Sequence, residues 1–391
     1  MRPLFFVIPF LILSFGLTIS HGADWPTLRG PDHNGISDAK LTLVEDEPER
    51  LWKTVAGRGN GGVVVENGLA LVYGTGQQNL TCIDAETGDM LWTKGNLDEW
   101  YGHHTPTLHE GKVYAQSFQT ETNPPKARCF DAKTGDEIWS VELPLTGGKR
   151  SWGMAGSPLI LDGLVYLNAG GGVALKAENG ESVWEFDGWP GLATPVLFQQ
   201  GGKDAIAFFL GQQLLARDLK TGAELWSIPW ETNSAVNACL PIFFDGKVLI
   251  NSGYGLHPAL FDIASGEPKE IWRKENGGHA FAASILHEGL VYGFFNNSFA
   301  CMDPADGTLL WRSEGTGSAL MIDGQFVWIS EKGELKVGPV SKVGPVSKDG
   351  FEPTLIAQVH SGIVRNNPAY VDGKLFLKNE KGEVVCVRIA Q

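Results

Sequence analysis

The chain has 391 residues, of which 43% are hydrophobic and 19% are charged, and its formal net charge is −14. This balance predicts a globular protein with enough apolar residues for a core. A negative surface repels phosphate groups, so we expect no binding to nucleic acid. The 50 glycines and 13 tryptophans favour β-structure with many tight turns.

The first 22 residues predict an export signal. Arg2 precedes an apolar run over 3–20, and small residues follow it. This is the layout of a secretory signal peptide, with cleavage near Gly22 or Ala23. An uncleaved anchor is the alternative, because the run is about long enough to span a bilayer. We expect cleavage, no further membrane-spanning segment, and a periplasmic or secreted mature protein.

An eleven-residue pattern ending in tryptophan recurs along the rest of the chain. Clear copies are CIDAETGDMLW at 82–92, CFDAKTGDEIW at 129–139 and ARDLKTGAELW at 216–226, and a looser copy at 261–272 has two extra residues. The tryptophans that belong to the pattern, spaced by 39 to 47 residues, are Trp52, Trp92, Trp139, Trp184, Trp226, Trp272 and Trp311. Such a period is typical of a four-stranded propeller blade. We expect each indole to pack between one blade and the next.

A second pattern lies between the tryptophans, in which a tight turn joins two alternating apolar stretches. The turns are Asn67-Gly68, Glu110-Gly111, Asp162-Gly163, Gly201-Gly202, Asp245-Gly246, Glu288-Gly289, Asp323-Gly324 and Asp372-Gly373. Dipeptides of this kind between alternating strands are strong hairpin signals. Eight hairpins predict eight blades.

The two ends of the repeat domain, which we place at 50–391, complement each other. RLWKTV at 50–55 has the pattern of an outer strand without companions, whereas 367–390 supplies three strands without an outer one. Pairing them completes an eighth blade and removes exposed strand edges. The predicted fold is therefore an all-β, eight-bladed propeller of four-stranded antiparallel blades, closed by the N-terminal strand and preceded by an extension over 23–49. The seventh blade lacks the tryptophan, and we expect its outer strand near 353–358.

The cysteines are predicted to be free thiols, although the chain is exported. Cys82, Cys129 and Cys301 each lie six residues before the turn glycine of their repeat, where other copies have Ala174 or Ala216. A cysteine in such a slot behaves as a small hydrophobic residue. Equivalent slots of different blades are too far apart for a disulfide.

The eleven-residue pattern resembles the tryptophan-docking motif of the pyrroloquinoline-quinone (PQQ) repeat family. Residues 216–226 match that motif at its alanine, aspartate, threonine, glycine and tryptophan. The opening DWPTLRGPDHNGIS at 24–37 is similar to the leader of secreted PQQ-like propellers of the Planctomycetes type. The same repeat occurs in BamB, a non-catalytic scaffold of outer-membrane assembly, and in quinoprotein alcohol dehydrogenases.

The resemblance implies an exported propeller and favours the BamB-like branch. The dehydrogenases hold PQQ with a vicinal Cys-Cys disulfide, bind Ca²⁺ and use an aspartate as base, whereas this shorter sequence has no Cys-Cys dipeptide. We therefore predict no cofactor and no catalytic residue, and a PQQ- and Ca²⁺-dependent dehydrogenase is the alternative. The BamB resemblance implies an envelope or outer-membrane protein as partner, although the lipidated cysteine of BamB is absent. We expect a monomer.

Candidate ligand-binding groups lie in the connections between consecutive blades, which gather at one end of the axial channel. These residues are Trp100, His103, His104, Arg150, Trp152, Trp189, Asn237, His279, Arg365 and Asn366. Tryptophan supplies stacking area, and arginine pairs with carboxylates. They predict a concave mouth for a protein loop, a small polar ligand or a glycan, so that a polysaccharide-binding lectin is a further alternative. The competing interpretation is that these groups are structural. We predict no metal, because adjacent histidines lack the spacing of a zinc motif.

Overall fold

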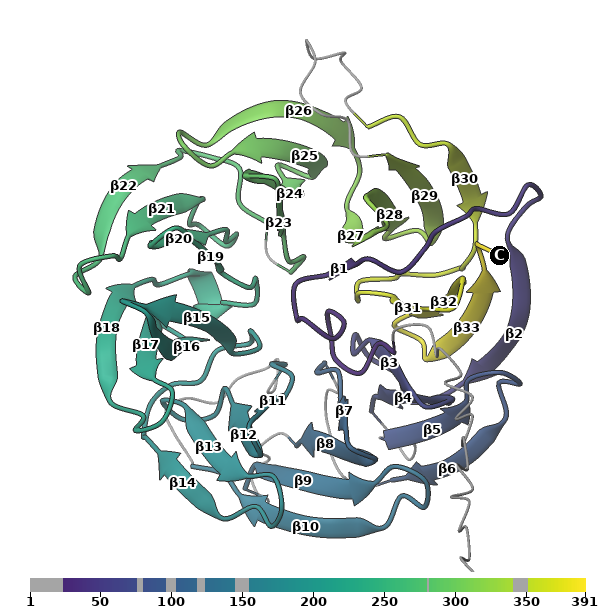
Figure 1. Cartoon of the computed structure of the whole chain (residues 1–391), viewed down its shortest axis with the longest axis horizontal. Coiled ribbons are helices and arrows are strands. Elements are labelled where there is room, and N and C mark those ends of the chain that lie inside the picture. The colour runs from purple at the N-terminus through teal and green to yellow at the C-terminus, as the bar shows by residue number, and fades with distance from the viewer. Residues whose placement is uncertain are drawn as a thin grey trace, which may run out of the picture.

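The computed structural model describes residues 24–75, 80–95, 103–117, 124–144, 155–279, 281–339 and 351–391. These residues form eight sheets, each built on four antiparallel strands, arranged as a disc around one axis (Figure 1). The expected signal over 1–22 lies outside them. No helix in these ranges is long and apolar enough to cross a membrane, and the short 3₁₀ helix η1 (Asn233–Ala235) lies between two blades.

Each blade has four strands, named here from the axis outward. Blades one to four are β3 (Val63–Glu66), β4 (Leu69–Tyr73), β5 (Leu80–Asp84), β6 (Met90–Lys94); β7 (Thr107–His109), β8 (Lys112–Gln116), β9 (Lys126–Asp131), β10 (Glu137–Glu142); β11 (Leu159–Leu161), β12 (Leu164–Leu167), β13 (Val173–Lys176), β14 (Ser182–Glu185); and β15 (Val196–Gln200), β16 (Lys203–Phe209), β17 (Gln213–Asp218), β18 (Glu224–Pro229).

The remaining blades follow the same order. Blades five to eight are β19 (Ile242–Phe244), β20 (Lys247–Ile250), β21 (Ala259–Asp262), β22 (Lys269–Arg273); β23 (Ile285–His287), β24 (Leu290–Phe295), β25 (Ser298–Asp303), β26 (Thr308–Glu314); β27 (Gly317–Ile322), β28 (Gln325–Ser330), β29 (Glu334–Pro339), β30 (Leu355–Gln358); and β31 (Ala369–Val371), β32 (Lys374–Lys378), β33 (Glu383–Arg388), β2 (Glu49–Val55). The strand β30 lies where the sequence predicts the outer strand of the seventh blade.

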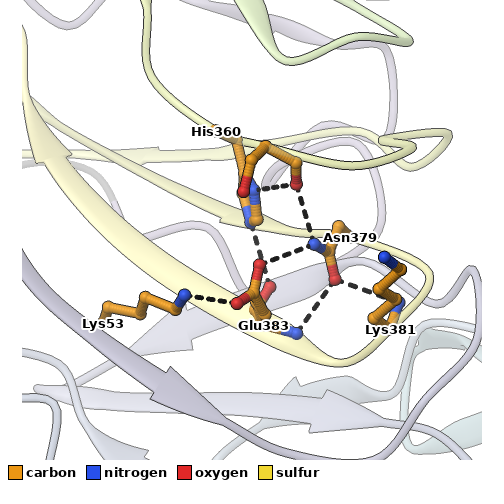
Figure 2. Close-up of polar contacts among 6 residues, drawn as sticks. Lys53, His360, Asn379, Lys381 and Glu383 are labelled. Atoms are coloured by element: carbon orange, nitrogen blue, oxygen red, sulfur yellow. Dashed lines mark hydrogen bonds and ion pairs between the residues drawn. The ribbon is translucent and has the colours of Figure 1, made fainter.

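The N-terminal strand closes the eighth blade, as predicted. β2 pairs antiparallel with β33 from Glu49↔Arg388 to Val55↔Glu383, and Figure 1 shows β2 outside β31–β33. Side chains reinforce this joint (Figure 2). Lys53 of β2 forms an ion pair with Glu383 of β33, whose other carboxylate oxygen accepts a hydrogen bond from Asn379 at 3.0 Å.

The predicted hairpin turns have the backbone that their residues favour. Asn67 has φ 51° and Gly68 has φ 78°, and the flanking residues Glu66 and Leu69 pair directly. Positive φ at both central residues is the signature of the two-residue turn whose twist matches that of the strands. The same local chemistry therefore folds the first two strands of each blade.

Docking tryptophans join blades to their neighbours. Indole Nε1 atoms donate to carbonyl oxygens in the next blade for the pairs Trp52–Ala85, Trp92–Ala132, Trp139–Ala177 and Trp272–Pro304, at 3.0–3.1 Å. The turn glycine three residues after the acceptor lies against the ring, and a Cβ on Gly88 would sit 2.7 Å from the Trp52 ring. Only glycine fits there. The eleven-residue pattern thus encodes an indole on one blade and the glycine that receives an indole from the previous blade.

Inside the blade, each docking indole except Trp272, which pairs with Leu260, faces a small residue on the neighbouring strand. Cys82 pairs with Trp92, Cys129 with Trp139 and Cys301 with Trp311 across the two outer strands, and Cys386 pairs with Trp52 in the closing blade. The five cysteines are free and buried. A small side chain at this position leaves room for the indole.

An N-terminal segment, 24–44, crosses the centre of the disc (Figure 1). Trp25 exchanges two backbone hydrogen bonds with Val65 of blade one, at 2.8 and 2.9 Å. Further along, β1 (Ile36–Ser37) runs parallel to β27 of blade seven, and Val44 donates to Ile389 of blade eight at 3.0 Å. The segment thus pairs with backbone groups on the inner strands of blades one and seven and with the residue just after β33 in blade eight.

Candidate functional site: the axial mouth

The connections between blades enclose a cavity of about 340 Å³ at the axis. Its described lining comes from the connections that follow blades one to five, seven and eight, from Tyr254 of blade five, and from Leu28 of the segment in the channel. We call this cavity the axial mouth. Connections between blades, which the sequence predicts to form a concave mouth, thus line this one cavity.

A row of hydroxyl groups forms part of the wall. Gly62 N donates to Thr105 Oγ1 at 2.8 Å, Thr105 N to Ser157 Oγ at 3.1 Å, and Ser157 N to Thr194 Oγ1 at 2.9 Å. The four residues occupy equivalent positions just before the inner strands of blades one to four, so the bonds step from blade to blade around the axis. Thr105, Ser157 and Thr194 are buried and line the mouth. Each hydroxyl accepts a backbone proton and keeps its own hydrogen to donate.

The opposite wall is apolar. The equivalent positions in blades five and six are Leu240 and Ala283, and Leu192 and Val236 lie beside them. Tyr254 and Phe281 stand at this side with exposed fractions of 39% and 49%, and their rings meet edge to face at a centroid distance of 5.9 Å. The mouth is therefore amphipathic, with hydroxyl and amide groups on one arc and hydrocarbon on the other.

Amide side chains complete the polar arc beside blade eight. Asn60 Nδ2 lies 3.3 Å from His103 Nδ1. Asn366 Nδ2 donates to the carbonyls of Lys378, at 2.8 Å, and of Gly61, at 3.3 Å, which fixes the orientation of this amide. Asn366 Oδ1 then has no hydrogen-bond partner in the described chain, although Asn366 is only 5% exposed. A buried acceptor without a donor is costly, and a bound ligand relieves that cost.

Charge is sparse at the mouth. Arg365 is the one charged side chain in the described lining, and its Nε lies 3.6 Å from Glu331. Burial lowers the pKa of His103 to about 4, so this imidazole is neutral at pH 7. Behind the wall, burial lowers the pKa of Lys378 to about 7 while its Nζ donates to Gly59 O at 2.7 Å.

Only some of the sequence-predicted residues line the mouth. His103, Arg365 and Asn366 line the mouth. Trp100, Arg150 and Trp152 lie outside the described residues, and Trp189 is half-buried, with its carbonyl accepting a bond from Gly211 at 2.8 Å.

Three other predicted residues hold the connections in place behind the lining. His104 accepts a bond from Gln116 N at 3.4 Å and packs on Tyr73, while Asn237 donates to Leu210 O at 2.7 Å. His279 Nδ1 accepts bonds from the backbone of its own turn. Burial lowers the pKa of His104 to about 3 and of His279 to about 4, so both rings are neutral supports at pH 7.

The hydroxyl row is the part of the site that sequence reasoning missed. The signal is a residue followed by proline just before an inner strand, as in Thr105-Pro106, Ser157-Pro158, Thr194-Pro195 and Leu240-Pro241. Proline restricts the preceding residue to an extended backbone. The repeated residue-proline pair therefore marks, in each of these blades, one position that faces the axis.

The donor set does not match a metal centre. No group of three or more His, Cys, Asp or Glu side chains with metal-binding geometry occurs in the described part of the chain. Calcium prefers carboxylate and carbonyl oxygens, and the described lining of the mouth contains no carboxylate.

Comparison with known proteins supports the assignment of the fold. A family model described as "Outer membrane protein assembly factor BamB" matches residues 38–144 and 117–313, together more than half of the chain. No curated protein shows significant sequence similarity to the whole.

Solved structures show the same architecture. BamB from Moraxella catarrhalis aligns with a TM-score of 0.64 and 13% identity over 88% of this chain and 100% of that one. A quinohemoprotein alcohol dehydrogenase from Pseudomonas putida HK5 aligns with a TM-score of 0.66 and 14% identity over 94% of this chain and 80% of that one. The computationally designed protein Ika8 aligns at 0.61 and 15%, over 90% and 99%. At these identities the likeness establishes the fold alone.

Proposed function

Because the chain belongs to the family described as outer membrane protein assembly factor BamB, we propose that it is an exported, non-catalytic scaffold of the periplasm or cell envelope. It acts there as a monomer without a quinone cofactor. Its axial mouth binds a loop of an envelope protein or a small polar ligand.

The amphipathic lining of the mouth is the observation that supports this proposal. The row Thr105, Ser157 and Thr194 offers hydroxyl donors, and Asn366 Oδ1 is an acceptor that lacks a donor. Leu240 and Phe281 face them from the apolar arc. A peptide loop or a hydroxylated small molecule presents polar and apolar groups side by side and fits such a wall.

The electrostatics favour binding over catalysis. A general acid or base works best with a pKa near the operating pH, whereas burial lowers the pKa of His103 to about 4. The only charged side chain in the described lining, Arg365, is already near Glu331. The side chains of the mouth are therefore suited to binding and positioning a ligand.

The test is capture of a partner with and without a filled mouth. Ala238→Trp places an indole in the mouth, and Ala305→Trp, on an exposed turn of blade six, is the matched control. Cross-linking in an envelope extract followed by mass spectrometry should recover one specific partner with the wild type and the control, but not with Ala238→Trp. Recovery of the same partner by all three proteins, or turnover of a substrate, would contradict the proposal.

A glycan is the second candidate ligand, because the exposed Tyr254–Phe281 pair is an aromatic surface at the rim of the mouth. Sugars stack on such surfaces through their apolar faces. A glycan array probed with the wild type and with Phe281→Ser tests it. Binding that survives the substitution would rule out this site.

A further inference from the structure

A second cavity, of about 310 Å³, lies in the axial channel next to the mouth. Leu28, Thr194 and Leu240 line both cavities, so they form the boundary between them. We call the second cavity the inner chamber. Its walls are the inner strands of blades three to six and the turn over 28–36 of the N-terminal segment.

Arg29 is a buried cation at the edge of this chamber. It is 4% exposed, and Nη2 donates to the carbonyls of Asn34 and Ser284, the latter at 2.9 Å. Both acceptors are neutral main-chain groups. Within the described residues no carboxylate lies at ion-pair distance from Arg29, and Nε has no acceptor. Burial lowers its pKa to about 10, so the guanidinium remains charged at neutral pH.

The turn that carries Arg29 is built to hold it in place. Gly35 has φ +78°, and a Cβ there would meet the guanidinium at 2.7 Å. Gly35 N donates to Arg29 O at 2.9 Å, and the buried ring of Trp25 covers Gly30 on the other side. A charge that is buried without a counter-charge is costly, yet the backbone is shaped to keep this one beside an open chamber. An anion in the chamber would offset this cost.

The rest of the lining selects the kind of anion. Leu197, Phe243 and Leu286 form an apolar wall, and Phe243 stacks on Phe198 at a centroid distance of 4.2 Å. Asp32 lines the same chamber and, like the net charge of −14, repels anions in proportion to their charge, so a monoanion is disfavoured least. One cation and a hydrocarbon wall match one carboxylate with a short apolar body.

We propose that the inner chamber binds a small organic monocarboxylate, with the carboxylate on the remaining donors of Arg29 and the apolar body against Leu197, Phe243 and Leu286. The carboxylate supplies the acceptors that Arg29 lacks, in charge-assisted hydrogen bonds. The site differs from the mouth of the proposed function and does not depend on what binds there.

Calorimetric titration of the purified protein with hexanoate at pH 7 and low salt tests the proposal. Two control ligands separate the contributions: 1-hexanol has the same hydrocarbon chain without the charge, and inorganic phosphate has charge without a hydrocarbon chain. We expect saturable 1:1 binding of hexanoate, at least about tenfold weaker binding of hexanol, and none of phosphate. No saturation by hexanoate, or equal binding of hexanol or phosphate, would overturn it.

Two substitutions locate the binding. Arg29→Gln should abolish the preference for hexanoate over hexanol, but it also disturbs the turn. Val196→Trp leaves Arg29 intact and fills the chamber from blade four, because Val196 lines the chamber and is only half-buried. It should abolish hexanoate binding, whereas Val183→Trp, on an exposed outer strand, should not. Unchanged hexanoate binding by a folded Val196→Trp protein would refute the site.

Discussion

Trp226 and Ile263 belong to neighbouring blades and are joined through one amide side chain. The indole Nε1 donates to Gln200 Oε1 at 2.9 Å, and Gln200 Nε2 donates to Ile263 O at 2.8 Å. At four other blade junctions the indole reaches the equivalent carbonyl directly, as Trp139 does at 3.0 Å. The looser copy at 261–272 leaves a gap here, and a Cβ on its turn glycine, Gly266, would touch nothing within 4 Å. Gln200 fills that gap.

This bridge predicts that Gln200→Ala lowers the free energy of unfolding by about 1–3 kcal/mol, because it leaves two partly buried polar groups without partners. Gln199→Ala, at the neighbouring exposed position, should change it by less than about 0.5 kcal/mol. Urea denaturation of both variants measures the difference. Equal effects would mean that the bridge adds no stability.

The turn glycines allow the backbone cost of a side chain to be separated from its packing cost. Gly222 has φ +71°, and a Cβ there would lie 2.7 Å from the Trp184 ring, whereas Gly163 has φ +74° and open space around it. Gly163→Ala should cost about 1–2 kcal/mol for the left-handed backbone alone. Gly222→Ala should cost about 1–3 kcal/mol more, because the methyl group displaces the indole. Thermal and urea unfolding measure the loss of unfolding free energy in each variant. Equal losses for Gly163→Ala and Gly222→Ala would contradict this prediction.

The ion pair in the closing blade predicts a small, pH-dependent stabilisation. Lys53 lowers the pKa of Glu383 below its usual value of 4.5, so the contribution is present at neutral pH and is lost as the pH falls through the folded-state pKa. Lys53 is 41% exposed, and water therefore screens the pair. A double-mutant cycle of Lys53→Met and Glu383→Gln should give a coupling energy of about 0.5–1 kcal/mol at pH 7. The coupling should decrease as the pH falls through the folded-state pKa of Glu383, and a coupling energy that stays constant as this carboxyl is protonated would argue against the pair.

Lys378 predicts a pH dependence of the same sign at higher pH, caused by burial of the amine rather than by an ion pair. Burial lowers the pKa of this amine from 10.5 to about 7, so between these values the unfolded chain binds more protons than the folded one. Stability relative to Lys378→Met should therefore increase as the pH rises from 7 to 10, by up to about 1.4 kcal/mol per pH unit. Lys381→Met, on the exposed turn of the same hairpin, is the control. Urea denaturation across this range measures the trend, and a constant difference would show that Lys378 is charged or neutral throughout.

The blade architecture could be predicted because its signals are local. Asn67-Gly68 specifies a hairpin from two residues, and each copy of the docking pattern carries both an indole and the glycine that receives one. The positions of Trp52 and of the strands after 367 also predict that the two ends close the eighth blade. Each end of the repeat array would otherwise have a strand edge with unpaired backbone groups. Nothing in these inferences requires contacts between residues whose positions along the chain are unrelated.

The sites were less predictable, because a propeller brings together residues from every blade. His104, Asn237 and His279 look like ligand groups in the sequence, yet each holds its own connection in place. Thr105, Ser157 and Thr194 look unremarkable, yet their backbone bonds join into one row around the axis. Gln200 and Arg29 acquire their roles from residues 63 and 255 positions away. The sequence by itself determined the repeated unit, its number and its closure, because turn geometry and strand periodicity are properties of neighbouring residues. Only the tertiary structure decided which side chains face the axis and which charge is buried without a partner, because those facts depend on the circular arrangement of the eight blades and on the segment that crosses it.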